Sequence, residues 1–213
     1  MRTTRDQSTM VPSIVHAIRV QILAGRLREG EVIHQTDLAK ELGVSPVPVR
    51  EALRSLEVEG IVTFLPFRGT IVSPVTPSEI SECYLIANAL GAVMLPICVP
   101  KLTESDLKAL HTHAERLDHG EATLDDFLGF YTVLLKPAEM PLMLDIVRNV
   151  GFRSIRIFAL ADANRKALNA TRPTRKDIIE AAASRDIART LAAFTEFHDV
   201  RRRGLLKALA ERN

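Results

Sequence analysis

The chain is poor in cysteine and in aromatic residues. Its 213 residues include two cysteines and no tryptophan, and aromatic residues make up 5% of the total. Cys83 and Cys98 stand in apolar stretches, and neither belongs to a CxxC motif. Zinc sites and thiol redox sites use cysteines at short spacing, so the sequence indicates neither. We expect both cysteines to be buried free thiols.

Targeting and membrane signals are missing as well. The N-terminus, residues 1–9, is polar and lacks the apolar core of a secretory signal. No apolar run is expected to approach the roughly 18 residues that a membrane span needs. We therefore expect a cytoplasmic protein.

The chain has neither a large charge of one sign nor the signature of a common enzyme. The net charge is +2, from 28 basic and 26 acidic residues, so bulk charge does not indicate a nucleic-acid-binding protein. A nucleophile elbow, a P-loop, a dinucleotide-binding glycine fingerprint and an HExxH motif are all missing. We expect the chain not to be an enzyme.

The first 75 residues predict three helices followed by a β-hairpin. Residue spacing indicates helices at about 10–25, 36–42 and 46–59, and β-branched runs indicate strands at 61–65 and 70–73. Gly43 ends the second helix, Ser45 is the expected N-cap of the third, and Pro46 takes its first position. A tight turn from Pro66 to Gly69 joins the two strands.

Two short helices joined by a tight turn are what a helix-turn-helix requires. The apolar stripe of the third helix leaves Val47, Arg50 and Arg54 on the solvent side. A helix docked by its N-terminal part can use Arg50 on a base edge or a phosphate and Arg54 on the DNA backbone. The alternative is that both arginines are solvated and pair with Glu51 or Glu57.

The predicted hairpin carries a cation at its tip. Arg68 and Gly69 place a guanidinium group and an unhindered backbone N–H where the wing of a winged helix crosses the minor groove. The complete order of a helix, a helix-turn-helix and a basic hairpin favours DNA binding over a set of unrelated surface arginines.

A domain boundary is predicted at Pro74 and Pro77, where the character of the sequence changes. Only helices are expected after it, at about 77–99, 103–118, 123–136, 139–168, 174–184 and 186–211. The predicted fold class is mainly α. A winged helix-turn-helix over residues 1–75 precedes an antiparallel all-α bundle over residues 76–213.

The stretch LREGEVIHQTDLAKELGVSPVPVREALRSLEVEGIVTFLPFRGTIVSPV closely resembles the winged-helix signature of GntR-type transcriptional regulators. The shared features are a Gly-rich turn, LAxxLGVS, PVREALRxLExEG and a wing ending in RGxxV, over about residues 10–75. Through FYTVLLKPAEMPLMLDIV and IIEAAASRDIARTLAAF, the helical remainder is similar to the FCD-type domain of the FadR-like branch. The resemblance implies a sequence-specific repressor or activator that binds double-stranded operator DNA.

The same resemblance implies a set of DNA-facing residues. These are Thr36, Ser45, Pro46, Val47, Pro48, Arg50, Arg54, Arg68 and Gly69. Two positions depart from the family pattern, because Pro46 stands where Arg often follows the Ser of GVS, and Thr36 where some relatives have Arg. Fewer direct base contacts are expected from these two positions.

Many FCD-type domains hold a divalent cation with one Asp and three His. In this sequence the four corresponding positions carry Phe127, Tyr131, Arg175 and Phe197, which are poor ligands for such a cation. We therefore expect no metal cofactor. A shift of one residue would bring in Asp126 and His198, although a lone His on an apolar helix face is more often a core residue.

A rebuilt pocket in the helical domain would have few polar side chains to line it. The candidates are Asn88, Tyr131, Arg153, Arg156, Arg175 and His198. Arginines in a mostly apolar bundle favour an anionic effector such as a small carboxylate metabolite. Each arginine could instead form a structural salt bridge, and in that case the helical domain would only dimerise and the protein would be a ligand-blind repressor.

Homodimerisation follows from the resemblance and from the small interface that one winged helix offers to DNA. The apolar stretch ALGAVMLPICV at 89–99 is a candidate for the two-fold interface, and the alternative is that it belongs to the core. The three arginines at 201–203 are expected on a solvated face.

Overall fold

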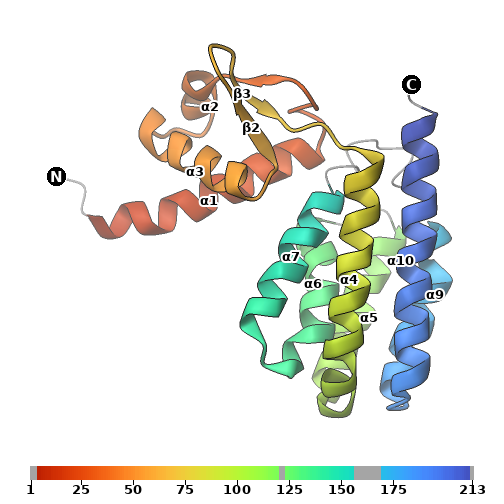
Figure 1. The fold of residues 1–213 in the computed structure, drawn as a ribbon. Helices are drawn as coiled ribbons and strands as arrows, with labels where there is room; N and C mark the ends of the chain where they lie inside the picture. Colours follow the sequence, from red (N-terminus) through yellow and green to blue (C-terminus); the bar gives the residue numbers. More distant parts are fainter. Residues whose placement is uncertain (1–3, 120–122, 156–168, 212–213) are drawn as a thin grey trace. The chain divides into compact units, whose positions relative to one another are not determined.

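The computed structural model describes residues 4–119, 123–155 and 169–211. The chain divides into two compact units, Met1–Val75 and Thr76–Asn213 (Figure 1). A small three-stranded sheet lies in the N-terminal unit, and the second unit is built from helices. This arrangement confirms the expected mainly α fold class.

The N-terminal unit is organised around the packing of two helices. Its elements are α1 (Thr4–Leu23), β1 (Val32–Ile33), α2 (Gln35–Glu41), α3 (Pro46–Val58), β2 (Val62–Leu65) and β3 (Gly69–Val72). Ile14, Ile18 and Ile22 recur at helical spacing on α1 and are at most 4% exposed. They share the core with Val49 and Leu53 of α3, which are fully buried. Burial of one such aliphatic side chain stabilises the fold by about 1.5–3 kcal/mol.

The sheet is antiparallel, with the strand order β1-β3-β2. Thr63 of β2 and Val32 of β1 both pair with Ile71 of β3. Strand β1 was not predicted, because two residues are too few for an alternating pattern to appear. The expected strands at 61–65 and 70–73 are present with ends shifted by one residue, as β2 and β3.

The second unit is a bundle of antiparallel helices. Its elements are α4 (Pro77–Cys98), η1 (Val99–Lys101), α5 (Glu104–His119), α6 (Leu124–Leu135), η2 (Lys136–Ala138), α7 (Pro141–Ile155), α9 (Arg172–Ala183) and α10 (Ile187–Ala210). The hydroxyl of Thr76 accepts a hydrogen bond from Glu79 N at 3.1 Å and caps α4, and Asp186 caps α10 in the same way. The helix expected over 139–168 begins at Pro141, and its predicted part from 156 to 168 lies outside the described residues.

The long helix α4 packs against both α10 and α7. The expectation that no apolar run approaches membrane-spanning length was wrong, because residues 83–100 contain no charged side chain. By length and composition alone, Pro77–Lys101 could cross a membrane. In this structure one side of α4 belongs to the core of the bundle, where Met94, Leu95 and Cys98 are fully buried.

Glycine at position 91 allows α4 to pack closely against α10. An added Cβ at Gly91 would lie 2.3 Å from the ring of Phe194 on α10, so only glycine fits there. Cys83 and Cys98 are free and buried, as expected. Burial raises the pKa of the Cys98 thiol to about 11, and this thiol donates a hydrogen bond to the Leu135 carbonyl at 3.2 Å.

Candidate nucleic-acid interface and internal pocket

The turn between α2 and α3 is held by backbone hydrogen bonds. Val44 N donates to the Ala39 carbonyl at 3.0 Å, and Gly43 takes a φ of +66°, a conformation that glycine adopts without strain. Ser45 is the N-cap of α3 in extended conformation, although its side chain makes no capping hydrogen bond. The expected cap position is therefore correct, and the Ser45 hydroxyl is exposed to solvent.

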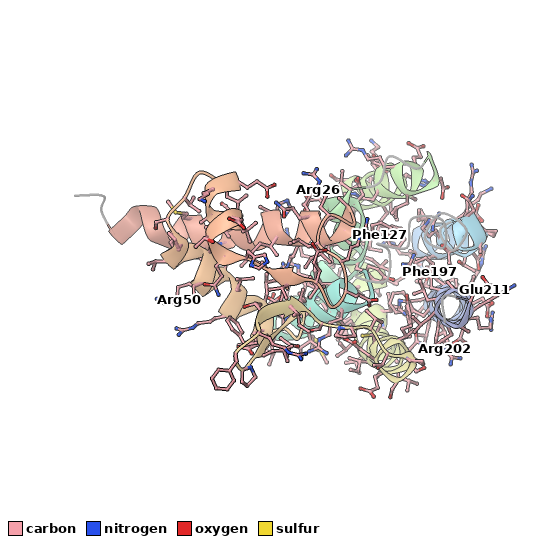
Figure 2. All side chains as sticks on the ribbon, turned by 90° about the horizontal axis from the view of Figure 1, so that it is seen from above. Arg26, Arg50, Phe127, Phe197, Arg202 and Glu211 are labelled. Carbon is pink, nitrogen blue, oxygen red and sulfur yellow. The ribbon has the colours of Figure 1, made fainter. Side chains whose placement is uncertain are left out.

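Helix α3 has one buried face and one exposed face. Pro48, Val49, Ala52, Leu53 and Leu56 are buried, and this stripe packs against α1 and α2. The opposite side exposes Pro46, Val47, Arg50 and Arg54. Pro48 was expected to face DNA and instead lies on the buried side, because it precedes Ala52 by one helical turn and so shares its face. Figure 2 shows the side chain of Arg50 pointing outward.

The two arginines of α3 have different surroundings. Arg54 lies 3.3 Å from Glu51 in an exposed i,i+3 ion pair, which is one of the pairings that the sequence left open. Among the described residues, Arg50 has no ion pair with a carboxylate. An exposed pair of this kind contributes only about 0–1 kcal/mol, so Arg54 can exchange Glu51 for a phosphate at little cost.

The wing presents its tip to solvent. Arg68 and Gly69 are exposed, as is Thr36 near the start of α2. Gly69 has a φ of +85° and begins β3, so the change of direction at the tip depends on glycine. Eight of the nine sequence-predicted DNA-facing residues are thus exposed, and Pro48 is not.

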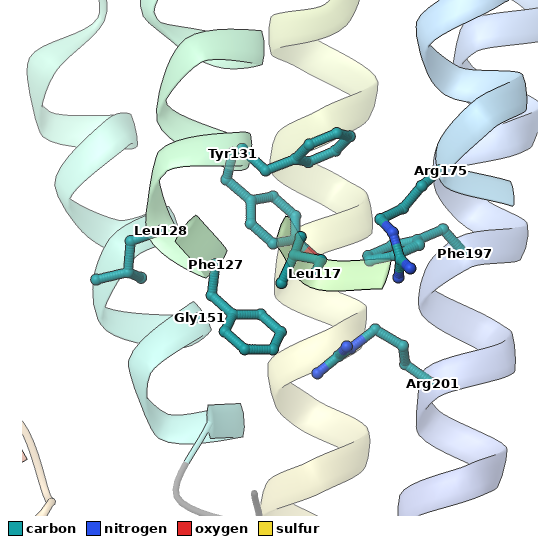
Figure 3. A pocket seen from close by; sticks show the side chains of 9 residues that line it. Leu117, Phe127, Leu128, Tyr131, Gly151, Arg175, Phe197 and Arg201 are labelled. Carbon is teal, nitrogen blue, oxygen red and sulfur yellow. The ribbon is translucent and has the colours of Figure 1, made fainter. Parts of the chain in front are cut away.

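A pocket lies inside the helical unit (Figure 3). Its lining residues are Leu117, Phe127, Leu128, Phe130, Tyr131, Gly151, Arg175, Phe197 and Arg201. The four positions that the family resemblance assigned to a metal site, Phe127, Tyr131, Arg175 and Phe197, are all among them. The atoms around the pocket leave a space of about 380 Å³, part of which is open to solvent. Because this volume includes open solvent, the enclosed part of the pocket is much smaller.

The donor set of this pocket does not fit a divalent cation. Two phenylalanines provide no ligand atom, and a guanidinium group repels a cation. Burial raises the pKa of Tyr131 above its ordinary value, which disfavours the phenolate that would bind metal. In the part of the chain that the structure describes, no cluster of three or more His, Cys, Asp or Glu could hold a metal ion.

Asp126, the first neighbour considered as a substitute ligand, forms a polar cluster of its own. Its carboxylate accepts hydrogen bonds from Thr123 N and Thr123 Oγ1 at 3.0 and 2.8 Å, and its own backbone N–H donates to Thr123 Oγ1 at 3.2 Å, which completes a capping box at the start of α6. His113 and Arg116 lie 3.1 and 3.4 Å away. Although burial opposes ionisation, these hydrogen bonds and the Arg116 charge hold the pKa of Asp126 below its usual range.

His198, the second neighbour, uses both ring nitrogens within the bundle. Nδ1 lies 2.6 Å from Asn88 Oδ1, and Nε2 lies 3.0 Å from the Tyr131 hydroxyl. A neutral imidazole satisfies both contacts, with Nδ1–H donating to Asn88 and Nε2 accepting from Tyr131. Burial, assisted by the charge of Arg201, lowers the pKa of His198 to about 3. This side chain is therefore a neutral core residue.

Two arginines provide the positive charge of the pocket. Arg175, on α9, is 1% exposed, forms an ion pair with Asp118 and lies 2.6 Å from Thr171 Oγ1. Arg201, on α10, donates from Nε to the Tyr84 hydroxyl at 3.2 Å and lies 5.6 Å from the centre of the Phe127 ring. Figure 3 shows both side chains extending toward the aromatic lining.

Arg201 was expected on a solvated face, and that expectation was wrong because the side chain is 3% exposed. Of the three consecutive arginines, only one can lie on the inward stripe of α10, and Arg201 follows Phe197 by one turn. Arg203 is exposed and pairs with Glu196 at 3.1 Å. Phe194, Phe197 and Arg201 follow one another at intervals of one helical turn. This spacing was the signal that could have predicted that Arg201 is buried.

The remaining effector candidates lie in different places. Asn88 is half-buried and contacts the pocket indirectly, through His198. Arg153 is absent from the pocket lining and lies 3.3 Å from Glu79 in an ion pair. Arg156 lies outside the described residues. The structure thus brings Tyr131 and Arg175 into the lining, with His198 and Asn88 behind them.

The helix-turn-helix and wing are similar to one family of known proteins. Residues 11–72 match the family described as "Bacterial regulatory proteins, gntR family". The uncharacterized HTH-type transcriptional regulator YdhC of Bacillus subtilis is 30% identical over 101 residues, which cover 47% of this chain and 45% of that protein. The HTH-type transcriptional repressor RspR of Escherichia coli is 24% identical over 143 residues, or 64% of this chain and 63% of that protein. The chain spans about half the length of the first curated relatives that it matches.

Solved structures share the fold over nearly the whole chain. The E. coli protein McbR/YncC superposes with a TM-score of 0.80 at 20% identity and covers 94% of this chain and 98% of its own. A transcriptional regulator of the GntR family from Pseudomonas syringae pv. tomato has a TM-score of 0.53 at 22% identity, covering 95% and 87%. At these identities the likeness concerns the fold alone.

The neutral state of His198 makes stability depend on pH. Since its folded pKa of about 3 is below the unfolded value of about 6.5, the unfolded state binds more protons in between, and stability is lost as pH falls below about 6.5. This group contributes a slope of up to about 1.4 kcal/mol per pH unit. Urea unfolding between about pH 7 and pH 5 measures it.

The variant His198→Asn should unfold more easily at neutral pH and show a shallower loss of stability toward pH 5. The matched control is His111→Gln, an exposed histidine on α5, which should retain the wild-type slope. Equal slopes in the wild type and in His198→Asn would contradict the assignment.

Proposed function

We propose that this chain, whose N-terminal unit carries the gntR-family winged helix-turn-helix, is a transcriptional regulator that binds double-stranded operator DNA. The observation that carries the proposal is the exposed face of α3. Arg50 and Arg54 project from it to solvent, whereas the opposite stripe is anchored on α1 and α2. The match to the family over residues 11–72 covers this same helix-turn-helix.

DNA would be contacted from two elements of the N-terminal unit. The N-terminal half of α3 enters the major groove, where Arg50 reaches a base edge or a phosphate and Arg54 reaches the backbone. Val47, at 54% exposure, offers an apolar contact such as a thymine methyl group would accept. The wing crosses the minor groove and brings Arg68 close to the backbone.

For the second unit we propose the role of an FCD-type effector domain of the FadR-like branch that works without a metal. Where the resemblance implies a cation site, this pocket has the guanidinium groups of Arg175 and Arg201 next to aromatic side chains. Buried arginines favour a bidentate anion, so the effector class is a small carboxylate with an apolar part. The enclosed space is small, so the ligand would have few non-hydrogen atoms.

One observation favours a second candidate, a ligand-blind dimer. Arg175 is already paired with Asp118, and both ring nitrogens of His198 have partners. A pocket with its polar groups paired internally can be structural. Ligand screening distinguishes the two candidates.

We further propose that the protein is a cytoplasmic homodimer joined through α4. The side of this helix that faces away from the core carries Leu85, Ala89, Ala92, Val93 and Pro96, all exposed and uncharged. A continuous apolar stripe on a surface helix indicates a protein contact, and a two-fold axis lets one stripe pair with its own copy. Two copies would then present two α3 helices to two half-sites of the operator.

Arg50→Ala should weaken binding to an operator duplex by about 1–3 kcal/mol, because a base or phosphate contact is lost. Fluorescence anisotropy on a duplex selected from a random library by the wild-type protein measures the change. Lys176→Ala, at an exposed position of the helical unit, serves as the control and should bind as the wild type does. Unchanged affinity of Arg50→Ala would contradict the docking of α3.

Small carboxylates should stabilise the helical unit in a thermal-shift screen. A ligand at 100 times its Kd contributes about 2.7 kcal/mol. Arg201→Met should abolish the ligand-dependent shift, while Arg203→Met, an exposed arginine two residues further along α10, should retain it. If no member of a broad panel of carboxylates and sugar acids stabilises the wild type, the ligand-blind dimer is favoured.

Val93→Glu should convert the dimer to a monomer, because a charge at the centre of the α4 stripe has to be desolvated in the interface. Val93 is 49% exposed, so the fold itself should tolerate the change. Sedimentation equilibrium gives the mass, and Thr112→Glu on the exposed face of α5 is the control. A wild-type monomer, or a Val93→Glu dimer, would contradict this interface.

A further inference from the structure

The tip of the wing contains an aromatic residue in an unusual conformation. Arg68 N donates to the Leu65 carbonyl at 3.2 Å, which closes a four-residue turn. Pro66 takes the second position of this turn and Phe67 the third. The third position has a φ of +62°, as in a type II turn, where glycine or asparagine is normally found.

The side chain of Phe67 does not pack into the core, so core packing does not offset the strain of this conformation. Its relative exposure is 109%, the largest among the exposed apolar residues of the described chain. A bulky L-residue at positive φ is strained, and exposure of a benzyl side chain to water is unfavourable as well. Both terms oppose the choice of phenylalanine, so its benefit has to come from outside the folded domain.

Arg185 shows one way in which such a backbone is compensated. It also has a φ of +62°, but its guanidinium group donates hydrogen bonds to the carbonyls of Val99 and Leu102 beyond the end of α4. These hydrogen bonds, which cap the end of a neighbouring helix, offset the strain of the Arg185 backbone. Phe67 has no comparable contact within the described residues.

We propose that Phe67 is a wedge that inserts its ring between base pairs, or between base and sugar, in the minor groove of the operator. The neighbouring Arg68 is exposed and would hold the adjacent phosphates, and Gly69 keeps the backbone narrow enough to enter. Apolar side chains inserted in this way unstack a base step and kink the duplex. The occupant is DNA rather than a protein because the ring stands beside a cation at a narrow hairpin tip, and the same unit exposes Arg50 and Arg54.

This inference rests on the proposed DNA-binding function and adds a deformation of the operator to it. Pyrimidine–purine steps unstack most easily, so a flexible step is expected where the wing meets each half-site. Sequence preference would then arise at a position that forms no hydrogen bond with the protein.

The test compares the full chain with Phe67→Asn on the operator duplex selected by the wild type. Asparagine tolerates positive φ, so the variant should fold and melt at a temperature equal to or a few degrees above that of the wild type. Its affinity for the duplex should nevertheless fall by about ten-fold, as expected for loss of base–aromatic stacking. A purely structural role for Phe67 would instead lower the melting temperature.

Insertion itself is read with 2-aminopurine placed at successive steps of the duplex. The wild type should raise its fluorescence at one step per half-site, and Phe67→Asn should not. Phe67→Leu, which keeps an apolar wedge, should restore part of the signal. Val58→Asn, at an apolar position of the same unit that is 88% exposed, should behave as the wild type does.

The remaining outcomes distinguish the wedge from the DNA-binding function, with one exception. If Phe67→Asn binds as the wild type while Arg50→Ala does not, the wedge is overturned and the DNA-binding function stands. A wild type that raises no 2-aminopurine signal, or a Phe67→Asn variant that changes oligomeric state instead of DNA affinity, also overturns the wedge. If the wild type selects no duplex, both proposals fail together.

Discussion

The burial of one stripe of α3 is the constraint on which the N-terminal unit depends. Because Val49, Ala52, Leu53 and Leu56 lie in contact with α1 and α2, the rotation of α3 about its own axis is determined. The same packing decides that Arg50 and Arg54 face outward, since they lie on the opposite side of a helix with 3.6 residues per turn. The proposed interface for DNA is thus a consequence of the hydrophobic core beneath it.

Polar ties between helices reinforce this packing. Arg19 of α1 pairs with Glu59 at the end of α3, and Gln21 donates to Glu41 of α2 at 2.9 Å. These contacts attach both ends of the helix-turn-helix to α1. A rigid support of this kind is needed where side chains have to meet base edges in a defined register, because small displacements remove hydrogen bonds.

In the helical unit the core of the bundle contains a chain of polar contacts. Asn88 of α4, His198 of α10 and Tyr131 of α6 connect three helices at distances of 2.6 and 3.0 Å. The rings of Phe194 and Phe197 pack around His198, which keeps the imidazole dry and neutral. The space beside it is lined by aromatic rings and two arginines, a lining that suits an anion better than a cation.

The sequence by itself determined the helices, the hairpin and the outward direction of Arg50 and Arg54, because helical periodicity, a glycine turn and proline at the start of a helix are local properties. It also determined that the four expected metal positions carry no suitable set of ligands, since this follows from residue identity. Only the tertiary structure decided which polar side chains meet in the bundle: Arg201 lies inside, Arg153 pairs with Glu79, and Asp126 caps its own helix. Such partners come from helices far apart in the chain. In addition, a shift of one position along a helix rotates a side chain by about 100° around the helix axis. Adjacent residues such as Phe197 and His198 therefore have different surroundings. The strained conformation of Phe67 likewise became visible only with the backbone, because a turn of Pro and Phe has no sequence signature for positive φ.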